Sequence, residues 1–304
     1  MTRRHFLHCA AAGLAAPLIL LLAQPSADEK RRRIGINTIL FRMRFPTTRV
    51  EGHPILPALT LADVPAFYAD RFRIHNVELW SRHFEAITPA YLKDLKKAIA
   101  RSQSRLINIQ LDSQPYKEGN IEGYFLGSKD DTMRLNSQRF VKQWIDAAAQ
   151  LGAEAVRINT ERGDFNTCVE SFREITAYAA AREVLVLVEN HGGFSADPDL
   201  HVRLIREVNH RNIRTSPDFG NHRPEIRYEA LRKIMPFAAE VEPKALPFNE
   251  KFEHVEYDFP RCMRIAAESG FSGVYSVDYW DKSNRPADYE KIADWLIENT
   301  MEYM

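Results

Sequence analysis

From residue 33 onward, short apolar segments of strand length alternate with amphipathic segments of helical period, and the alternation occurs eight times. Strands are predicted near residues 34–40, 74–80, 105–111, 153–159, 184–190, 213–218, 238–244 and 271–279. Helices are predicted at 60–72, 88–101, 133–151, 164–181, 197–209, 225–236, 258–269 and 286–300. Because each strand is followed by a helix, the pattern favours a parallel sheet covered by helices.

Eight such units in about 275 residues are typical of a TIM barrel, and they fit an open doubly wound sheet less well. Thr88-Pro89 and Asp197-Pro198 support the helix boundaries, since each places a capping residue before a proline. No glycine fingerprint for a dinucleotide and no phosphate-binding loop follows the first predicted strand. We therefore expect an α/β fold, a single (β/α)8 TIM barrel over residues 29–304, preceded by an export signal.

That signal is predicted over residues 1–28. Arg3 and Arg4 precede an apolar run from Ala10 to Ala23, and the segment from Pro25 to Asp28 ends it. The pattern resembles a twin-arginine signal peptide, which implies the twin-arginine export machinery as a partner and a periplasmic or otherwise exported location. At about 14 residues the run is too short to span a bilayer, so we expect no stable membrane span after cleavage.

The charges of the chain are balanced. Its 304 residues include 41 basic and 41 acidic side chains. No overall field therefore attracts the protein to nucleic acid, and we expect no nucleic-acid partner. Cys168 and Cys262 fall on separate predicted helices, so we expect buried free thiols and no disulfide.

The predicted strands become polar at their carboxyl ends. The apolar run from Val184 to Val188 stops at Glu189, and the next strand leads to Asp218. Successive strand residues face opposite sides, so in a barrel one parity points at the axis. The carboxyl-end mouth is where such barrels keep their chemistry, so convergence of this parity there indicates a functional site. Its polar members are Asn37, Glu78, Asn108, Gln110, Asp112, Arg157, Asn159, Glu189, Asp218, Glu242, Lys244 and Asp278.

Plainer interpretations stay open at this point. Glu189 and Asp218 either serve a metal or an acid–base pair, or they cap helices and pair with nearby arginines. Two connecting segments, 42–58 and 113–132, are long enough to be lids over the mouth or surface insertions.

The order and strand positions of several motifs resemble one family, the xylose isomerase-like TIM barrels, often called sugar phosphate isomerases/epimerases. The resemblance covers nearly all of the chain after the predicted signal. It rests on Val77-Glu78-Leu79-Trp80, Glu189-Asn190-His191-Gly192-Gly193, Pro217-Asp218-Phe219-Gly220-Asn221, Glu242-Pro243-Lys244, and Gly270-Phe271-Ser272-Gly273 leading to Ser276-Val277-Asp278.

The resemblance implies a divalent metal at the mouth, held by side chains after strands five to eight. Glu189 and Asp218 match the first two ligands, whereas Glu242 stands where a His is frequent and Asp278 where a Glu is usual. The implied metal ligands are therefore Glu189, Asp218, Glu242 and Asp278, whose oxygen donors favour Mn²⁺ or Mg²⁺ over Zn²⁺. If Glu242 instead pairs with Lys244 or Arg157, the metal site is weak or empty.

The implied chemistry is proton transfer beside a carbonyl. A metal bound to the carbonyl and the adjacent hydroxyl acidifies the proton between them and stabilises the enediolate. Glu189 and Asp278 are the candidate pair that removes and returns the proton. Further catalytic candidates are His191, as a relay or only as a structural partner across Gly192-Gly193, and Lys244, which would stabilise negative charge. Candidate substrate-binding residues are Glu78, Trp80, Arg157, Asn159, Asn221 and His222. For Glu78 the alternatives are a base or an arginine partner, and an aromatic at a strand end such as Trp80 more often serves packing.

The leading hypothesis is thus a metal-dependent isomerase or epimerase acting on a small-molecule carbohydrate, a sugar or polyol derivative, through an enediolate. A second hypothesis keeps this chemistry but ends in lyase or hydrolase action on a keto-glycoside outside the cytoplasm. A nuclease similar to endonuclease IV is disfavoured by the neutral charge and by the lack of a histidine-rich zinc cluster. A non-catalytic carbohydrate-binding barrel stays open because of the replacements at Glu242 and Asp278.

Overall fold

A computed structural model describes residues 25–54, 56–112, 124–160 and 163–304. Residues 1–24 of the predicted signal lie outside these ranges, and so do residues 113–123 of the predicted lid at 113–132. Within them, the strands are β1 (Ile34–Asn37), β2 (Asn76–Trp80), β3 (Arg105–Gln110), β4 (Ala155–Ile158), β5 (Leu185–Glu189), β6 (Ile213–Ser216), β7 (Glu240–Val241), β8 (Lys244–Ala245) and β9 (Val274–Tyr279).

The strands form a parallel sheet in the order β6-β5-β4-β3-β2-β1-β9-β7, and β8 also pairs with β9. Single parallel bridges, Thr215 to Ala238 and Asp218 to Glu242, link the β6 side to the β7 side. The seventh predicted strand is therefore two short pieces, and between them lies Pro243, which has no N–H to donate. This arrangement confirms the predicted α/β fold with a TIM-barrel-like sheet.

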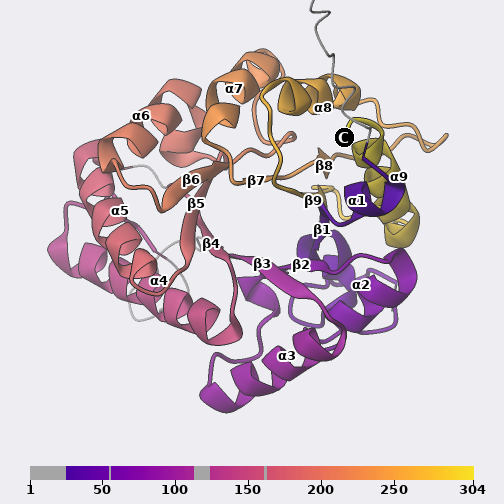
Figure 1. Cartoon of the computed structure of the whole chain (residues 1–304), viewed down its shortest axis with the longest axis horizontal. Helices are drawn as coiled ribbons and strands as arrows, with labels where there is room; N and C mark the ends of the chain where they lie inside the picture. Colours follow the sequence, from indigo (N-terminus) through magenta and orange to yellow (C-terminus); the bar gives the residue numbers. More distant parts are fainter. Residues whose placement is uncertain (1–24, 55, 113–123, 161–162) are drawn as a thin grey trace, which may run out of the picture.

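Helices surround the sheet as a ring (Figure 1). Each predicted helix is present, with ends shifted by a few residues, and a short α1 (Ala27–Arg31) precedes β1. No helix in the described ranges is both long and apolar enough to cross a membrane. The ring consists of α2 (Val64–Phe72), α3 (Pro89–Arg101), α4 (Asp131–Leu151), α5 (Phe165–Ala180), α6 (Pro198–Val208), α7 (Arg227–Ile234), α8 (Phe259–Glu268) and α9 (Tyr289–Glu302).

The hydrophobic core lies between the sheet and the helices. Val77, Val156 and Val277, which belong to the apolar parity of their strands, are completely buried in it. Burial of this face is the main favourable contribution to folding. Cys168 and Cys262 are buried and free, as predicted.

The interior of the barrel is polar. Asn108 on β3 donates a hydrogen bond from Nδ2 to Oε1 of Glu78 on β2 at 2.8 Å and to Oε1 of Glu240 on β7 at 3.3 Å. All three side chains are buried. Burial and the neighbouring Glu240 carboxyl raise the pKa of Glu78, and burial with Glu242 beside it raises the pKa of Glu240 to about 8. The Glu240 carboxyl therefore holds a proton at neutral pH.

The raised pKa of Glu240 predicts a loss of stability at high pH. Its folded-state proton contributes stability in full below the ordinary pKa of a glutamate, and this contribution is lost as pH rises through about 8. We expect the unfolding midpoint Tm to fall by about 5 °C or more from mildly acidic to mildly alkaline buffer. In Glu240→Gln, which cannot ionise, the fall is smaller. Thermal unfolding followed by circular dichroism checks this.

The exposed Glu250 offers the matched control. Glu250→Gln is expected to keep the pH dependence of the wild-type Tm. Equal dependence in Glu240→Gln and the wild type would contradict the assignment of the buried proton.

Candidate active site

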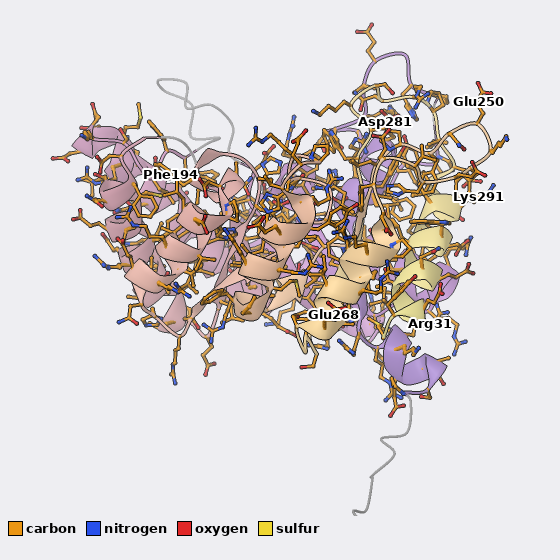
Figure 2. All side chains as sticks on the ribbon, turned by 90° about the horizontal axis from the view of Figure 1, so that it is seen from above. Arg31, Phe194, Glu250, Glu268, Asp281 and Lys291 are labelled. Carbon is orange, nitrogen blue, oxygen red and sulfur yellow. The ribbon has the colours of Figure 1, made fainter. Side chains whose placement is uncertain are left out.

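A pocket of about 510 Å³ opens at the carboxyl ends of the strands. Figure 2 shows the barrel from the side, with Asp281 and Glu250 at this end and Arg31 and Glu268 at the other. The pocket is in the size range of small-ligand sites. Eight predicted site residues line it: Trp80, Arg157, Asn159, Glu189, His191, Asn221, Lys244 and Asp278.

The other predicted site residues do not line the pocket. Asp218 and Glu242 are fully buried beneath it, and Glu78 lies among the buried carboxyls of the barrel interior. His222 belongs to a different surface hollow, together with Asp199 and Lys233. Glu78 and His222 therefore do not line this pocket, and their role as substrate-binding side chains stays a prediction.

Some pocket residues were not selected as site residues from the sequence. They are Ile39, Arg82, Gly192, Trp280 and Lys282, whereas Gln110 and Asp112, which also line the pocket, belong to the polar parity identified from the sequence. Trp280 and Lys282 follow the end of β9, shortly after Asp278 in the sequence. This nearness to a predicted site residue is the signal that could have identified them. Arg42 fixes this segment, because it donates to the carbonyl oxygens of Tyr279 and Asp281 at 3.3 and 3.0 Å and lies over the Trp280 ring, 4.4 Å from its centroid.

The described part of the predicted lid at 42–58 packs away from this pocket. None of its described residues lines the pocket, and His53 is nearly buried. Nε2 of His53 and the hydroxyl of Tyr289 on α9 lie 3.1 Å apart. This segment therefore packs against α9 and does not act as a wall of the pocket.

Lys244 lies at the floor of the pocket among acidic side chains. β8 pairs with β9 so that Lys244 is opposite Asp278, and Nζ lies 3.3 Å from Oδ2 of Asp278. Nζ also pairs with Oδ2 of Asp218 and lies 3.9 Å from Oε1 of Glu189. Burial alone would lower the pKa of Lys244, but the charges of Asp218, Asp278 and Glu189 raise it above its usual value. The ammonium group therefore stays charged.

Arg157 on β4 is the second cation of the floor. Its Nη1 lies 2.5 Å from Oε2 of Glu189, and Nη2 donates to the Gln110 side chain. Asn221 donates from Nδ2 to Oε1 of Glu189 at 2.6 Å. Burial would raise the pKa of Glu189, but the charges of Arg157, His191 and Lys244 together outweigh burial and lower the pKa to about 2. Glu189 is therefore a fixed carboxylate.

Asp218 and Glu242 are held by separate groups. Oδ1 of Asp218 accepts from the backbone N–H of Gly220 at 2.7 Å, beside the Lys244 pair at Oδ2. Glu242 accepts from the Ser216 hydroxyl at Oε1, 3.0 Å, and from the Gln110 amide at Oε2, 3.1 Å. Burial and the charges of Glu189 and Glu78 raise the pKa of Glu242. The sequence left open that Glu242 pairs with Lys244 or Arg157. In the structure these two cations pair with other carboxylates.

The same contacts decide how well the predicted ligands fit a divalent metal. Glu189, Asp218 and Glu242 each place one carboxylate oxygen within 4.8 Å of the others, a spacing that a shared cation requires. However, Nζ of Lys244 takes the position between Asp218, Asp278 and Glu189, and the oxygens of Glu242 are bound to Ser216 and Gln110. In this arrangement the four carboxylates cannot coordinate one divalent ion jointly.

His191 contributes to the wall of the pocket. Its Nδ1 lies 3.2 Å from Nδ2 of Asn159, while its backbone N–H donates to the Ser195 hydroxyl at 3.3 Å. The ring is therefore held at the pocket by Asn159, and the backbone hydrogen bond closes the turn that contains Gly192 and Gly193. The position of the ring at the pocket is compatible with the predicted relay, and the backbone hydrogen bond is compatible with the predicted structural role across Gly192-Gly193.

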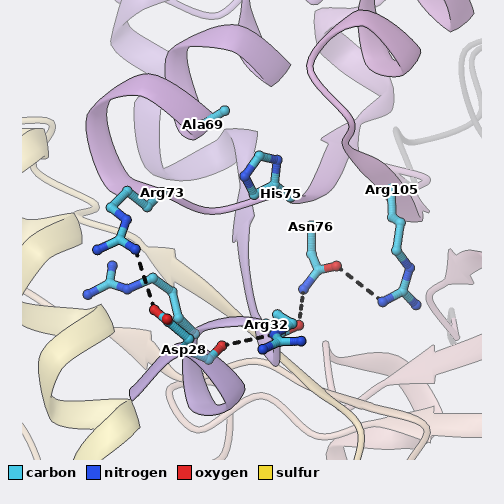
Figure 3. A pocket seen from close by; sticks show the side chains of 8 residues that line it. Asp28, Arg32, Ala69, Arg73, His75, Asn76 and Arg105 are labelled. Atoms are coloured by element: carbon cyan, nitrogen blue, oxygen red, sulfur yellow. Dashed lines mark hydrogen bonds and ion pairs between the residues drawn. The ribbon is translucent and has the colours of Figure 1, made fainter. Parts of the chain in front are cut away.

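A second cavity, of about 490 Å³, lies at the opposite end of the barrel, where β2 and β3 begin (Figure 3). Arginines dominate its lining, but two of them already have acidic partners. Arg73 lies 3.4 Å from Asp28 and Arg105 lies 2.7 Å from Glu154, and these side chains are largely exposed. No predicted site residue lies here, and exposed pairs of this kind contribute little. The pocket at the carboxyl ends is therefore the candidate active site.

Solved structures with the same fold include several sugar-converting enzymes. The 3-keto-D-glucoside 4-epimerase of E. coli, in its apo form, has a TM-score of 0.64 and 14% identity over 87% of this chain and 98% of its own. The D-psicose 3-epimerase of Clostridium cellulolyticum H10 with D-tagatose has a TM-score of 0.62 and 13% identity over 89% and 96%. At such low identity these likenesses establish the fold alone.

A xylose isomerase-like TIM barrel protein from Mycobacterium smegmatis, in complex with magnesium, has a TM-score of 0.61 and 16% identity over 90% of this chain and 98% of its own. No curated protein sequence matches this chain. The sequence model of one family matches residues 72–299, from the end of α2 to the last helix. This match covers most of the described barrel and agrees with the resemblance found in the motifs. The chain belongs to the xylose isomerase-like TIM barrel family.

Proposed function

We propose that the protein isomerises or epimerises a keto-sugar or a related polyol derivative in the pocket at the carboxyl ends of the strands. One observation carries the proposal: two carboxylates, Asp278 from β9 and Glu189 from β5, line the pocket with an oxygen 3.3 and 3.9 Å, respectively, from the Lys244 ammonium nitrogen. A base next to a fixed positive charge is what proton removal beside a carbonyl requires. The sugar epimerases with the same fold support this choice of substrate class.

Asp278 is the better candidate for removing the proton. The pKa of Glu189 is lowered to about 2, above all by Arg157, so Glu189 is a weak base while this ion pair lasts. Lys244 donates a charged hydrogen bond to the carbonyl oxygen and stabilises the enediolate as its negative charge develops. Glu189, as the second carboxylate, keeps Arg157 and Asn221 in place at the floor.

The walls of the pocket suit a sugar. Trp80 and Trp280 line the pocket and provide aromatic surface for the apolar side of a sugar ring. Asn159 and Asn221 add amide groups, and Arg82 and Lys282 add positive charge. The proposed reaction does not use the predicted divalent ion, because the Lys244 ammonium group lies among the carboxylates that would bind it.

Exchange of a substrate proton with solvent tests the proposal. In D₂O, the wild type is expected to place deuterium on the carbon next to the carbonyl of a keto-sugar from a panel of ketohexoses and 3-keto-glucosides. Asp278→Asn, which removes the base, is expected to lower the exchange rate about 100-fold or more. Nuclear magnetic resonance measures the exchange.

Glu250→Gln, at an exposed position on the same end of the barrel, is the matched control and is expected to exchange at the wild-type rate. Sugar binding without any exchange by the wild type would contradict the proposal and favour a carbohydrate-binding barrel.

A second outcome of the same proton removal is elimination or hydrolysis of a keto-glycoside. The fold likeness to an enzyme named for a 3-keto-D-glucoside is what favours this class of substrate. Incubation with a 3-keto-glucoside of p-nitrophenol separates the two reactions, because an epimerase leaves the glycosidic bond intact. We expect a changed sugar configuration without release of p-nitrophenol. Release of p-nitrophenol would replace the isomerase proposal by lyase or hydrolase action.

We also propose that residues 1–28 export the folded protein through the twin-arginine machinery to the periplasm or beyond. The support is Arg3-Arg4 followed by the apolar run from Ala10 to Ala23. Changing both arginines to lysine is expected to retain the protein in the cytoplasm, measured by fractionation and by the mass of the chain. A double lysine variant that is exported as well as the wild type would argue against this route.

A further inference from the structure

We infer that the ammonium group of Lys244 takes the place of a divalent cation at the floor of the pocket, so that the site works without a bound metal ion. The inference goes beyond the proposed function, since it concerns the cation and not the reaction. It also explains why the predicted ligands converge although they do not hold a metal together.

The coordination around Nζ of Lys244 carries this inference. Nζ pairs with Oδ2 of Asp218 and lies 3.3 Å from Oδ2 of Asp278, 3.4 Å from Oδ1 of Asn221 and 3.9 Å from Oε1 of Glu189. These oxygens come from β5, β9 and the segment after β6, which are separate parts of the barrel. Three of the four residues that surround the ammonium group, Glu189, Asp218 and Asp278, are predicted metal ligands.

The position of Lys244 is built into the backbone around it. β8 sets Lys244 opposite Asp278, and the Tyr257 hydroxyl donates to the Lys244 carbonyl oxygen. Gly220 faces the lysine stem: a Cβ atom at this position would lie 3.1 Å from Cδ and 3.3 Å from Cγ of Lys244. The absence of a side chain at Gly220 therefore lets the stem pass to the carboxylates.

The charges agree with this assignment. Lys244 and Arg157 together supply two positive charges, the same charge as a divalent ion, and both are buried against Glu189. A divalent ion among the same carboxylates would meet the ammonium group at close range, and like charges repel most strongly where water is excluded. Glu242, the predicted ligand from the β7–β8 region, is bound to Ser216 and Gln110 instead.

Lys244→Met tests the inference, because methionine keeps an unbranched apolar stem and removes the charge. Mn²⁺ binding is measured on the full chain by electron paramagnetic resonance and equilibrium dialysis, without substrate. The wild type is expected to bind no Mn²⁺ at millimolar concentration. Lys244→Met is expected to bind a single Mn²⁺ per chain and to gain thermal stability when Mn²⁺ is added. Lys282→Met removes a lysine from the same pocket and is expected to behave as the wild type.

A wild type that binds one Mn²⁺ per chain, with the binding lost in Glu189→Gln, would overturn the inference. A folded Lys244→Met variant that gains no Mn²⁺ would also overturn it. Should circular dichroism show that this variant does not fold, Lys244→Gln replaces it, since glutamine is shorter and uncharged, keeps a hydrogen-bond donor for the carboxylates and is expected to admit Mn²⁺. If it admits none, the inference fails. A failure to find sugar turnover leaves all of these measurements unchanged.

Discussion

The contacts of Lys244 join several strands of the barrel at one buried point. Its ammonium group pairs with Asp218 after β6 and lies 3.3 Å from Asp278 on β9, while its own backbone belongs to β8. Buried charges are tolerated only when they are paired and hydrogen-bonded, so each of these groups depends on the others. Arg157 and Glu189 extend the same network toward β4 and β5. The pocket floor is therefore one electrostatic unit and not a set of independent side chains.

This unit shapes what the pocket offers a substrate. A permanently charged ammonium group lies next to Asp278 and faces the pocket, whereas Glu189 is neutralised by Arg157. The preorganised charge favours an anion that develops during a reaction, because no reorganisation is required at that moment. Below the floor, Glu240 holds a proton at neutral pH and burial raises the pKa of Glu78, so the interior adds less negative charge than its composition suggests.

Much of the fold was predictable because it depends on local patterns. The apolar parity of the strands and the capped helix starts located each strand and helix to within a few residues, and the polar parity identified Glu189, Lys244 and Asp278 as neighbours. The pairing of charges was not predictable, since Lys244 and Asp218 meet only through the closure of the barrel. Trp280 was missed for another reason: it follows β9, where the chain turns and strand parity no longer applies.

The glycine that faces the lysine stem ties two distant positions together. A Cβ atom at Gly220 would lie 3.1 Å from Cδ and 3.3 Å from Cγ of Lys244, so a side chain there would press the lysine stem out of its present position. The fit of the lysine stem beneath the pocket therefore depends on a residue that lies on another loop, 24 positions earlier in the chain.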